Sequence, residues 1–340
     1  MTSSPTYPTA TSMNNTAHIP VPSTSKTQIS SAASSPSPSP SPSSSLPEPP
    51  NGSGGDELIP IVPLIKAVFP IGQGSQSWTT AQGAGDELPI SDATFRPTNN
   101  MRSLSHNTVT SPGPNPKPAI EAIFPAGSWT FGHGNDGGFS FYAPGPEEVD
   151  LTIAKEATFG YSVMFEEGWE WNRGGKLPGF YGGDNEEVAM TCSGGRHDEG
   201  CWSARLMWRR EGAGEMYTYL PPNFEENKVL CDLPPFSTCN PTYGTSVSRG
   251  SFHFKAGDWT TVSQRVRLND PGQANGELEL FVDGTSVINA SGLVLRDSHD
   301  GRIRGIEMQT FFGGSTSDWA SPKDQKAYFS DFSVAITDML

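Results

Sequence analysis

From about residue 90 onward, hydrophobic and polar residues alternate in short segments that Gly, Pro and Asp separate. In WTTVSQRVRL, residues 259–268, Val262 and Val266 are out of phase with Arg265 and Arg267. A period of two residues is typical of a β-strand, because successive side chains point to opposite faces. No segment shows an apolar stripe at helical spacing over twelve residues. The pattern therefore predicts an all-β fold, an antiparallel β-sandwich of the jelly-roll type.

One turn can be assigned from the sequence alone. In LELFVDGTSVIN, residues 278–289, two alternating segments flank the dipeptide Asp283-Gly284. This dipeptide favours the type I′ turn, whose two central residues both need a left-handed backbone conformation. We therefore expect a β-hairpin here.

Composition divides the chain into two parts. Residues 1–55 include SPSPSPSPSSSLPEPPNGSGG and hold only Lys26 and Glu48 as charged side chains. Such a segment has too little apolar surface to offset the entropy of ordering it, so it is predicted to be a disordered Ser/Pro-rich linker. Residues 56–340 are then one jelly-roll domain.

The charge of the chain excludes some partners. The formal net charge is −15, and no block rich in Lys or Arg occurs. This argues against nucleic acid or an anionic membrane as a partner. The apolar run LIPIVPLIKAVFPI is too short, and too interrupted by Pro and Lys, to span a bilayer. We expect a monomer.

The four cysteines indicate an oxidising compartment. Their spacings favour the local disulfides Cys192–Cys201 and Cys231–Cys239 among the three pairings that four cysteines allow. No CxxC motif or close His pair supports a zinc site, and no metal or cofactor is expected. Glycosylation sequons begin at Asn14, Asn51 and Asn289. We expect an extracellular glycoprotein, although no signal peptide is visible in MTSSPTYPTATSMNNTAHIP.

A candidate site lies in CWSARLMWRREGAGEMYTYLPP, residues 201–222. Ser203 and Arg205 share one face of the first strand, while Tyr217 and Tyr219 share one face of the second. A turn near Glu211 would place Arg205 opposite Tyr217 and Ser203 opposite Tyr219. A guanidinium can hold a carboxylate, and a nearby cation lowers the pKa of a phenol. The alternative is that Arg205 only stacks on Tyr217.

A second candidate segment is WNRGGKLPGFYGGD, residues 171–184. Its glycines make it unsuitable for the interior of a stable strand, but they allow a bulky ligand to approach the backbone beside Lys176. The alternative is a surface loop with an exposed lysine.

Together these residues resemble a known family. GGKLPGFYGG, CSGG, SARLMWR, GAGEMYTYLP, RGSFHF and TFFGGS follow one another as in polysaccharide lyase family 14, over most of residues 66–337. The resemblance implies a β-jelly roll that cleaves mannuronan-type or glucuronan-type polymers by β-elimination. It also implies that the functional side chains are those of Lys176, Ser203, Arg205, Tyr217 and Tyr219.

The implied reaction is a syn elimination. In β-1,4-linked mannuronate or glucuronate, the C5 proton and the C4 oxygen lie on the same side of the ring, so one tyrosine can serve as base and then as acid. Arg205 and Lys176 would neutralise the carboxylate. Tyr219 is favoured as the base because Ser203, placed opposite, could position it.

Three further residues are candidates for binding the acidic polysaccharide. Arg173 adds a cation, Trp171 could stack on a sugar, and Phe312 could line the groove or mark a strand end. A non-catalytic carbohydrate-binding module is the alternative function, but it would not need Lys176, Arg205 and the tyrosine pair together. A glycoside hydrolase would need paired carboxylates alternating on one strand, and none is present.

Overall fold

The computed structural model describes residues 61–133 and 135–340, which lie within one compact unit. The predicted linker, residues 1–55, lies outside the described residues. No helix in the described part of the chain is long and apolar enough to cross a membrane. The helix α1 Ile61–Val68 precedes the first described strand, and short helices lie between later strands: α2 Asp92–Phe95, α3 Glu186–Ala189, and the 3₁₀ turns η1 Leu151–Ile153, η2 Arg210–Gly212, η3 Glu225–Cys231 and η4 Ser317–Trp319.

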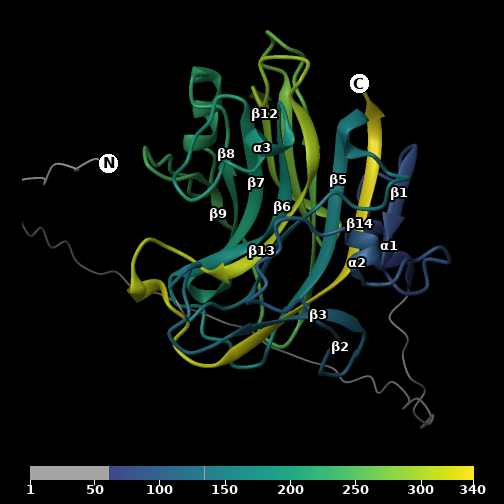
Figure 1. Cartoon of the computed structure of the whole chain (residues 1–340), viewed down its shortest axis with the longest axis vertical. Helices are drawn as coiled ribbons and strands as arrows, with labels where there is room; N and C mark the ends of the chain where they lie inside the picture. The colour runs from purple at the N-terminus through teal and green to yellow at the C-terminus, as the bar shows by residue number, and fades with distance from the viewer. Residues whose placement is uncertain (1–60, 134) are drawn as a thin grey trace, which may run out of the picture. The chain divides into compact units, whose positions relative to one another are not determined.

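The described strands form two antiparallel sheets, which confirms the predicted β-sandwich (Figure 1). The eight-stranded sheet has the order β12 Thr285–Leu293, β11 Gly276–Val282, β10 Trp259–Arg267, β5 Ala154–Phe165, β14 Gln325–Met339, β3 Pro118–Phe124 and β2 Thr108–Thr110, with β1 Gln76–Thr79 paired to β14. The six-stranded sheet has the order β4 Phe139–Ala143, β13 Arg302–Phe312, β6 Gly174–Gly183, β7 Cys201–Arg209, β8 Ala213–Tyr219 and β9 Thr245–His253.

The hydrophobic core joins the two sheets. Aromatic rings of β3, β7 and β13 meet there: the ring centroid of Trp208 lies 6.1 Å from that of Phe124 and 5.2 Å from that of Phe312. Ala204 and Leu206 on β7 belong to the same core. Because side chains alternate along a strand, the side chains between them on β7 face the other way, away from the core.

Strand β6 corrects one expectation. The Gly-rich segment forms the interior of the sheet, where it pairs with both β7 and β13. A Cβ atom added to Gly175 would lie 2.1 Å from the Trp208 ring, and one added to Gly182 would lie 2.5 Å from the Trp202 ring. The glycines are therefore compatible with a strand because neighbouring indoles occupy the space that side chains would need.

The hairpin of β11 and β12 is confirmed. Val282 pairs with Thr285, so Asp283 and Gly284 form the two-residue turn. Their φ angles are 47° and 80°, both in the left-handed region that a type I′ turn requires.

Candidate active site

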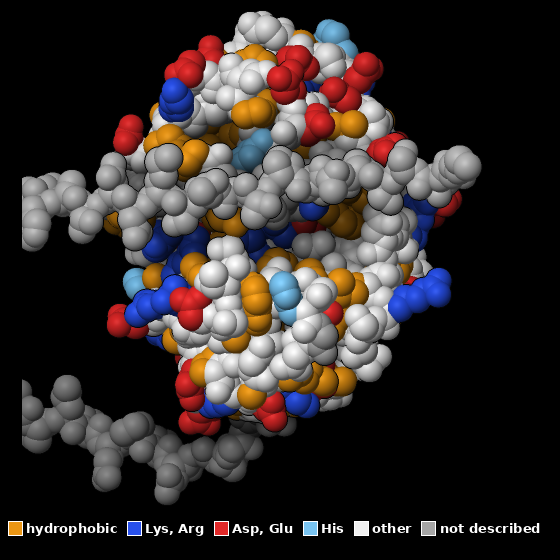
Figure 2. All heavy atoms as spheres, turned by 60° about the vertical axis from the view of Figure 1, so that its left-hand side comes forward, with side chains coloured by type: hydrophobic (Ala, Val, Ile, Leu, Met, Phe, Trp, Pro, Cys, Tyr) orange, Lys and Arg blue, Asp and Glu red, His pale blue; other side chains and the backbone are white. Residues whose placement is uncertain are grey.

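A cleft of about 460 Å³ opens on the face of the six-stranded sheet that points away from the core. Lys176, Arg205, Tyr217 and Tyr219 all line it. Figure 2 shows Lys and Arg side chains gathered in a hollow of the molecular surface. Although the whole chain is acidic, this hollow is locally cationic, and its size suits a ligand of several sugar-sized units.

The hairpin of β7 and β8 has the expected register. Arg205 pairs with Tyr217, and Ser203 pairs with Tyr219. The Tyr217 and Tyr219 ring centroids lie 5.9 Å apart, with the planes at 75°. Strand alternation therefore places the guanidinium and both phenols on one face, as the sequence indicated.

Arg205 is held by side chains of β13, which lies in the same sheet on the other side of β6. Its side chain is almost inaccessible and forms an ion pair with Glu307 at 2.8 Å and a hydrogen bond to the Gln309 side-chain oxygen at 3.0 Å. Burial raises the pKa of the Glu307 carboxyl, although Arg205 acts in the opposite direction. Neither partner could be predicted from the sequence, because nothing local indicated that β13 would pair with β6 and bring them within reach of Arg205.

Lys176 lies on β6 and contacts side chains of β7 and β8 in the same cleft. Its Nζ is 3.5 Å from the Tyr217 ring centroid and 3.0 Å from the Met207 sulfur. Burial lowers the pKa of this amine well below its ordinary value, and the neighbouring Arg205 and Arg209 lower it further. The alternative of an exposed loop lysine is therefore wrong.

The two tyrosines have different surroundings. Burial raises the pKa of the Tyr217 phenol above its ordinary value, and Tyr219 adds to this rise, although Arg209 and Arg205 oppose it. The nearby cations thus act on the pKa of Tyr217 in the expected direction, but burial outweighs them and the pKa is raised. The Tyr219 oxygen instead accepts a hydrogen bond from the Gly195 backbone N–H at 3.0 Å. The His197 ring centroid lies 4.9 Å from that of Tyr219.

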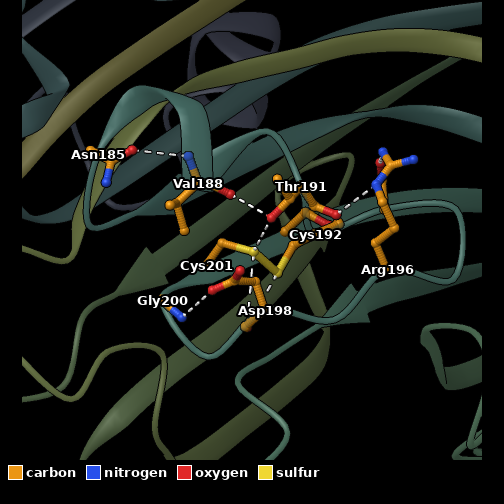
Figure 3. The surroundings of a disulfide bond; sticks show 10 residues. Asn185, Val188, Thr191, Cys192, Arg196, Asp198, Gly200 and Cys201 are labelled. Carbon is orange, nitrogen blue, oxygen red and sulfur yellow. Dashed lines mark hydrogen bonds between the residues drawn. A yellow bond between two sulfur atoms is a disulfide. The ribbon is translucent and has the colours of Figure 1, made fainter. Parts of the chain in front are cut away.

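This backbone donor belongs to the loop between Cys192 and Cys201, and Figure 3 shows the disulfide that closes the loop. Both predicted disulfides, Cys192–Cys201 and Cys231–Cys239, are present. The Ser203 hydroxyl donates to the Cys192 carbonyl at 2.8 Å. The expectation that Ser203 positions Tyr219 directly is therefore corrected: Ser203 binds the loop, and the loop contacts Tyr219.

The three candidates for sugar binding lie outside the cleft lining. Phe312 is buried in the core, and alternation along β13 places Phe311 in the cleft instead. Trp171 packs on Phe165, with ring centroids 4.7 Å apart. Arg173 forms an ion pair with Asp318 and lies 6.0 Å from the ring of Trp319, which lines the cleft.

A second charged group in the cleft wall was not predicted from the sequence. Glu215 is fully buried and pairs with Arg209 and Arg249. Glu215 shares the phase of Tyr217 and Tyr219, and Arg209 shares that of Arg205, so strand alternation was the signal that could have revealed them. Within residues 61–133 and 135–340, no three His, Cys, Asp or Glu side chains converge as a metal site would require.

A β-sandwich with such a cleft of arginine, lysine and tyrosine side chains fits a class of enzyme, the polysaccharide lyases. The family model of polysaccharide lyase 14 matches residues 113–332, and the chain belongs to this family. None of the curated proteins matches the chain in sequence.

Solved structures are similar over most of the described residues. The crystal structure of the marine PL-14 alginate lyase from Aplysia kurodai is 33% identical, covers 67% of this chain and 87% of its own, and has a TM-score of 0.60. An alginate lyase from Chlorella virus is 24% identical, covers 72% of this chain and 93% of its own, and has a TM-score of 0.58. The second comparison supports the fold alone.

Proposed function

We propose that this lyase cleaves β-1,4-linked uronic-acid polymers, of mannuronan or glucuronan type, by syn β-elimination. The observation that carries the proposal is the convergence of Lys176, Arg205, Tyr217 and Tyr219 in one cleft. The similar structure from Aplysia kurodai is an alginate lyase, which supports an acidic polysaccharide as the substrate class.

Arg205 and Lys176 can stabilise the negative charge that the reaction develops on the substrate carboxylate. The C5 proton can leave only if the negative charge that spreads onto the adjacent carboxylate is stabilised. Glu307 and Gln309 hold Arg205 in one position, so its guanidinium needs little reorganisation when that charge develops. Lys176 supplies a second donor beside it.

Tyr219 is better suited than Tyr217 to act as the base. Burial disfavours ionisation of Tyr217, whose ring also lies under the Lys176 amine. The Tyr219 oxygen accepts the Gly195 N–H, and this contact holds the oxygen at one position in the cleft. Tyr217 then remains protonated and orients the sugar.

The elimination needs no further reactant. The Tyr219 phenolate takes the C5 proton, the electron pair of that C–H bond forms the C4–C5 double bond, and the C4–O bond breaks. The same tyrosine returns its proton to the departing oxygen. The products are a new chain end and a 4,5-unsaturated uronate.

Substitution of the base tests this proposal. We expect Tyr219→Phe to lower kcat for formation of the unsaturated product by at least about 100-fold, the scale of general acid–base catalysis, while polymer binding persists. Ultraviolet absorbance of the product and calorimetric titration with polymer give the two readouts. Tyr328→Phe, on the eight-stranded sheet, is the matched control and should keep full activity. Full activity of Tyr219→Phe would rule out this base.

We also propose that the protein acts outside the cell, because its two disulfides are typical of proteins from oxidising compartments.

A further inference from the structure

Strand β12 forms one edge of the eight-stranded sheet, and in that sheet its neighbour among the described strands is β11 alone. Its nine residues include no charged side chain and no proline. The pairing with β11 shifts in register near both ends, but residues 288–291 pair without a break. An edge strand presents unpaired N–H and C=O groups, to which a strand of another molecule can bind. The middle of β12 is therefore open to such pairing.

Three other sheet edges differ from β12. β2 has only three residues. On the free side of β4, the backbone of Thr98 forms two hydrogen bonds with that of Tyr142, at 2.8 and 2.9 Å. β9 carries the cation Arg249, and Thr238 pairs with this strand across its free side. Short length, a covering segment and charge are common ways of preventing edge-to-edge pairing. The middle of β12 is neither short nor charged, and no described segment pairs with its free side.

Asn289 lies in this uninterrupted part of β12 and begins the sequon Asn289-Ala290-Ser291. Ile288 and Ala290 belong to the core, so alternation directs the Asn289 side chain away from it. Asn289 and Ser291 are both exposed. The cleft lies on the outward face of the other sheet, so a large group attached to Asn289 does not obstruct it.

We propose that Asn289 carries an N-linked glycan, which prevents the β12 edge from pairing with a second copy of this chain. In the transfer, the Asn289 amide nitrogen bonds to the anomeric carbon of an oligosaccharide on a lipid diphosphate carrier. The bond from that carbon to the diphosphate oxygen breaks, the amide loses one proton, and the lipid diphosphate leaves. A glycan is bulky and hydrated, so it occupies the space that a pairing strand would need. The inference goes beyond the lyase activity and rests on the extracellular location proposed above.

The first test asks whether Asn289 is modified. The full chain with Asn14→Gln and Asn51→Gln, exported by a eukaryotic secretory host, retains Asn289 as its one sequon. Mass spectrometry of the intact protein and of its peptides should show a glycan on Asn289. Asn289→Gln and Ser291→Ala should remove this glycan, whereas Ser291→Thr should keep it. An unmodified Asn289 in the exported protein would overturn the site.

The second test asks what the glycan does. Light scattering at increasing concentration measures self-association of the glycosylated protein, Asn289→Gln and Asn289→Lys, all purified from the same host. We expect Asn289→Gln to associate several-fold more strongly than the glycosylated protein, and Ser291→Ala to behave in the same way. Asn289→Lys should restore the monomer without a glycan, because a lysine on an edge strand also prevents pairing.

Equal association of Asn289→Gln and the glycosylated protein, or no recovery in Asn289→Lys, would overturn the protective role. Turnover of polymer should be the same in all of these variants, since Asn289 lies on the sheet that does not form the cleft. Neither the mass nor the light scattering depends on a substrate, so both results stand even if the protein fails to cleave uronans.

Discussion

At the scale of single residues, Lys176 is a side chain of the proposed active site that lowers the stability of the folded protein. Its amine lies on the Tyr217 ring, near two arginines, and its pKa is held well below the ordinary value. A positive charge placed there raises the free energy of the folded state, because burial and like charges both disfavour it. Sites under functional constraint often retain such costs.

Lys176→Met should therefore be more stable than wild type and inactive. Methionine keeps a long apolar stem without the charge, and we expect the free energy of unfolding to rise by about 1 kcal/mol near neutral pH. The folded-state pKa of Lys176 lies below its unfolded value of about 10.4, so wild-type stability rises with pH through that interval. The gain should thus shrink as pH approaches about 10. Chemical denaturation across pH measures it.

The exposed Lys255 provides the control for this experiment. Lys255→Met should leave the free energy of unfolding within about 0.5 kcal/mol of wild type. A Lys176→Met protein that is less stable than wild type, or whose gain does not depend on pH, would contradict the assigned environment of Lys176.

The sequence predicted which residues of β7 and β8 share a face, but it did not predict their ion-pair partners or pKa shifts. Alternation alone placed Arg205 with Tyr217 and Tyr219 on one face. It could not reveal Glu307, because that residue comes from a strand about a hundred positions later in the chain. Nor could it give the direction of the Tyr217 pKa shift, since burial depends on the tertiary structure and outweighs the nearby cations.

At the scale of elements, the loop between Cys192 and Cys201 connects a disulfide to the proposed base. The loop presents the Gly195 N–H to Tyr219 and the Cys192 carbonyl to Ser203. Figure 3 shows the same loop tied to α3, where the Thr191 hydroxyl donates to the Val188 carbonyl at 2.8 Å. The disulfide therefore limits the positions that the Gly195 donor can occupy.

Removing this disulfide should lower stability and turnover together. For the double variant Cys192→Ser, Cys201→Ser we expect a loss of about 2–3 kcal/mol in the free energy of unfolding, as for a short closed loop. We also expect kcat to fall well below wild type at temperatures where the variant remains folded, because the donor to Tyr219 is no longer fixed. Steady-state kinetics and denaturation measure the two effects.

The other disulfide is the matched control. The bonded cysteines are separated by nine positions in one disulfide and eight in the other, so the stability losses should be similar. Cys231→Ser, Cys239→Ser should keep the larger kcat, since neither cysteine closes the loop whose Gly195 N–H donates to the Tyr219 oxygen. Equal kcat in the two variants would argue against a positioning role for the first loop.

For strand β6, the sequence pattern gave a wrong prediction of secondary structure. The glycines of β6 indicated a loop, yet they lie in the middle of a sheet because Trp208 and Trp202 fill the space above them. Intrinsic strand preference is measured one residue at a time, whereas this strand depends on partners in β7. The turn at Asp283-Gly284 was predictable because its requirement is local.

At the scale of the whole molecule, one sheet and the loops beside it line the cleft, while both sheets contribute to the core. Alternation, turn residues and the absence of helical stripes were enough for the fold class. The order of the strands was not predictable, because neighbours such as β5 and β14 are far apart in sequence. The overall charge of −15 gave no sign of the cationic cleft, because that charge is a sum over the whole chain and the cleft uses only a few residues.

The proposed syn elimination on uronans can be tested by the formation of its unsaturated product. The most direct measurement is the ultraviolet absorbance of purified protein incubated separately with polymannuronate, β-1,4-glucuronan and polyguluronate. We expect absorbance of the unsaturated product to rise with polymannuronate or glucuronan. A rise with polyguluronate alone would contradict the syn mechanism, because its C5 proton lies on the opposite face of the ring. No rise with any of the three would contradict the proposed function.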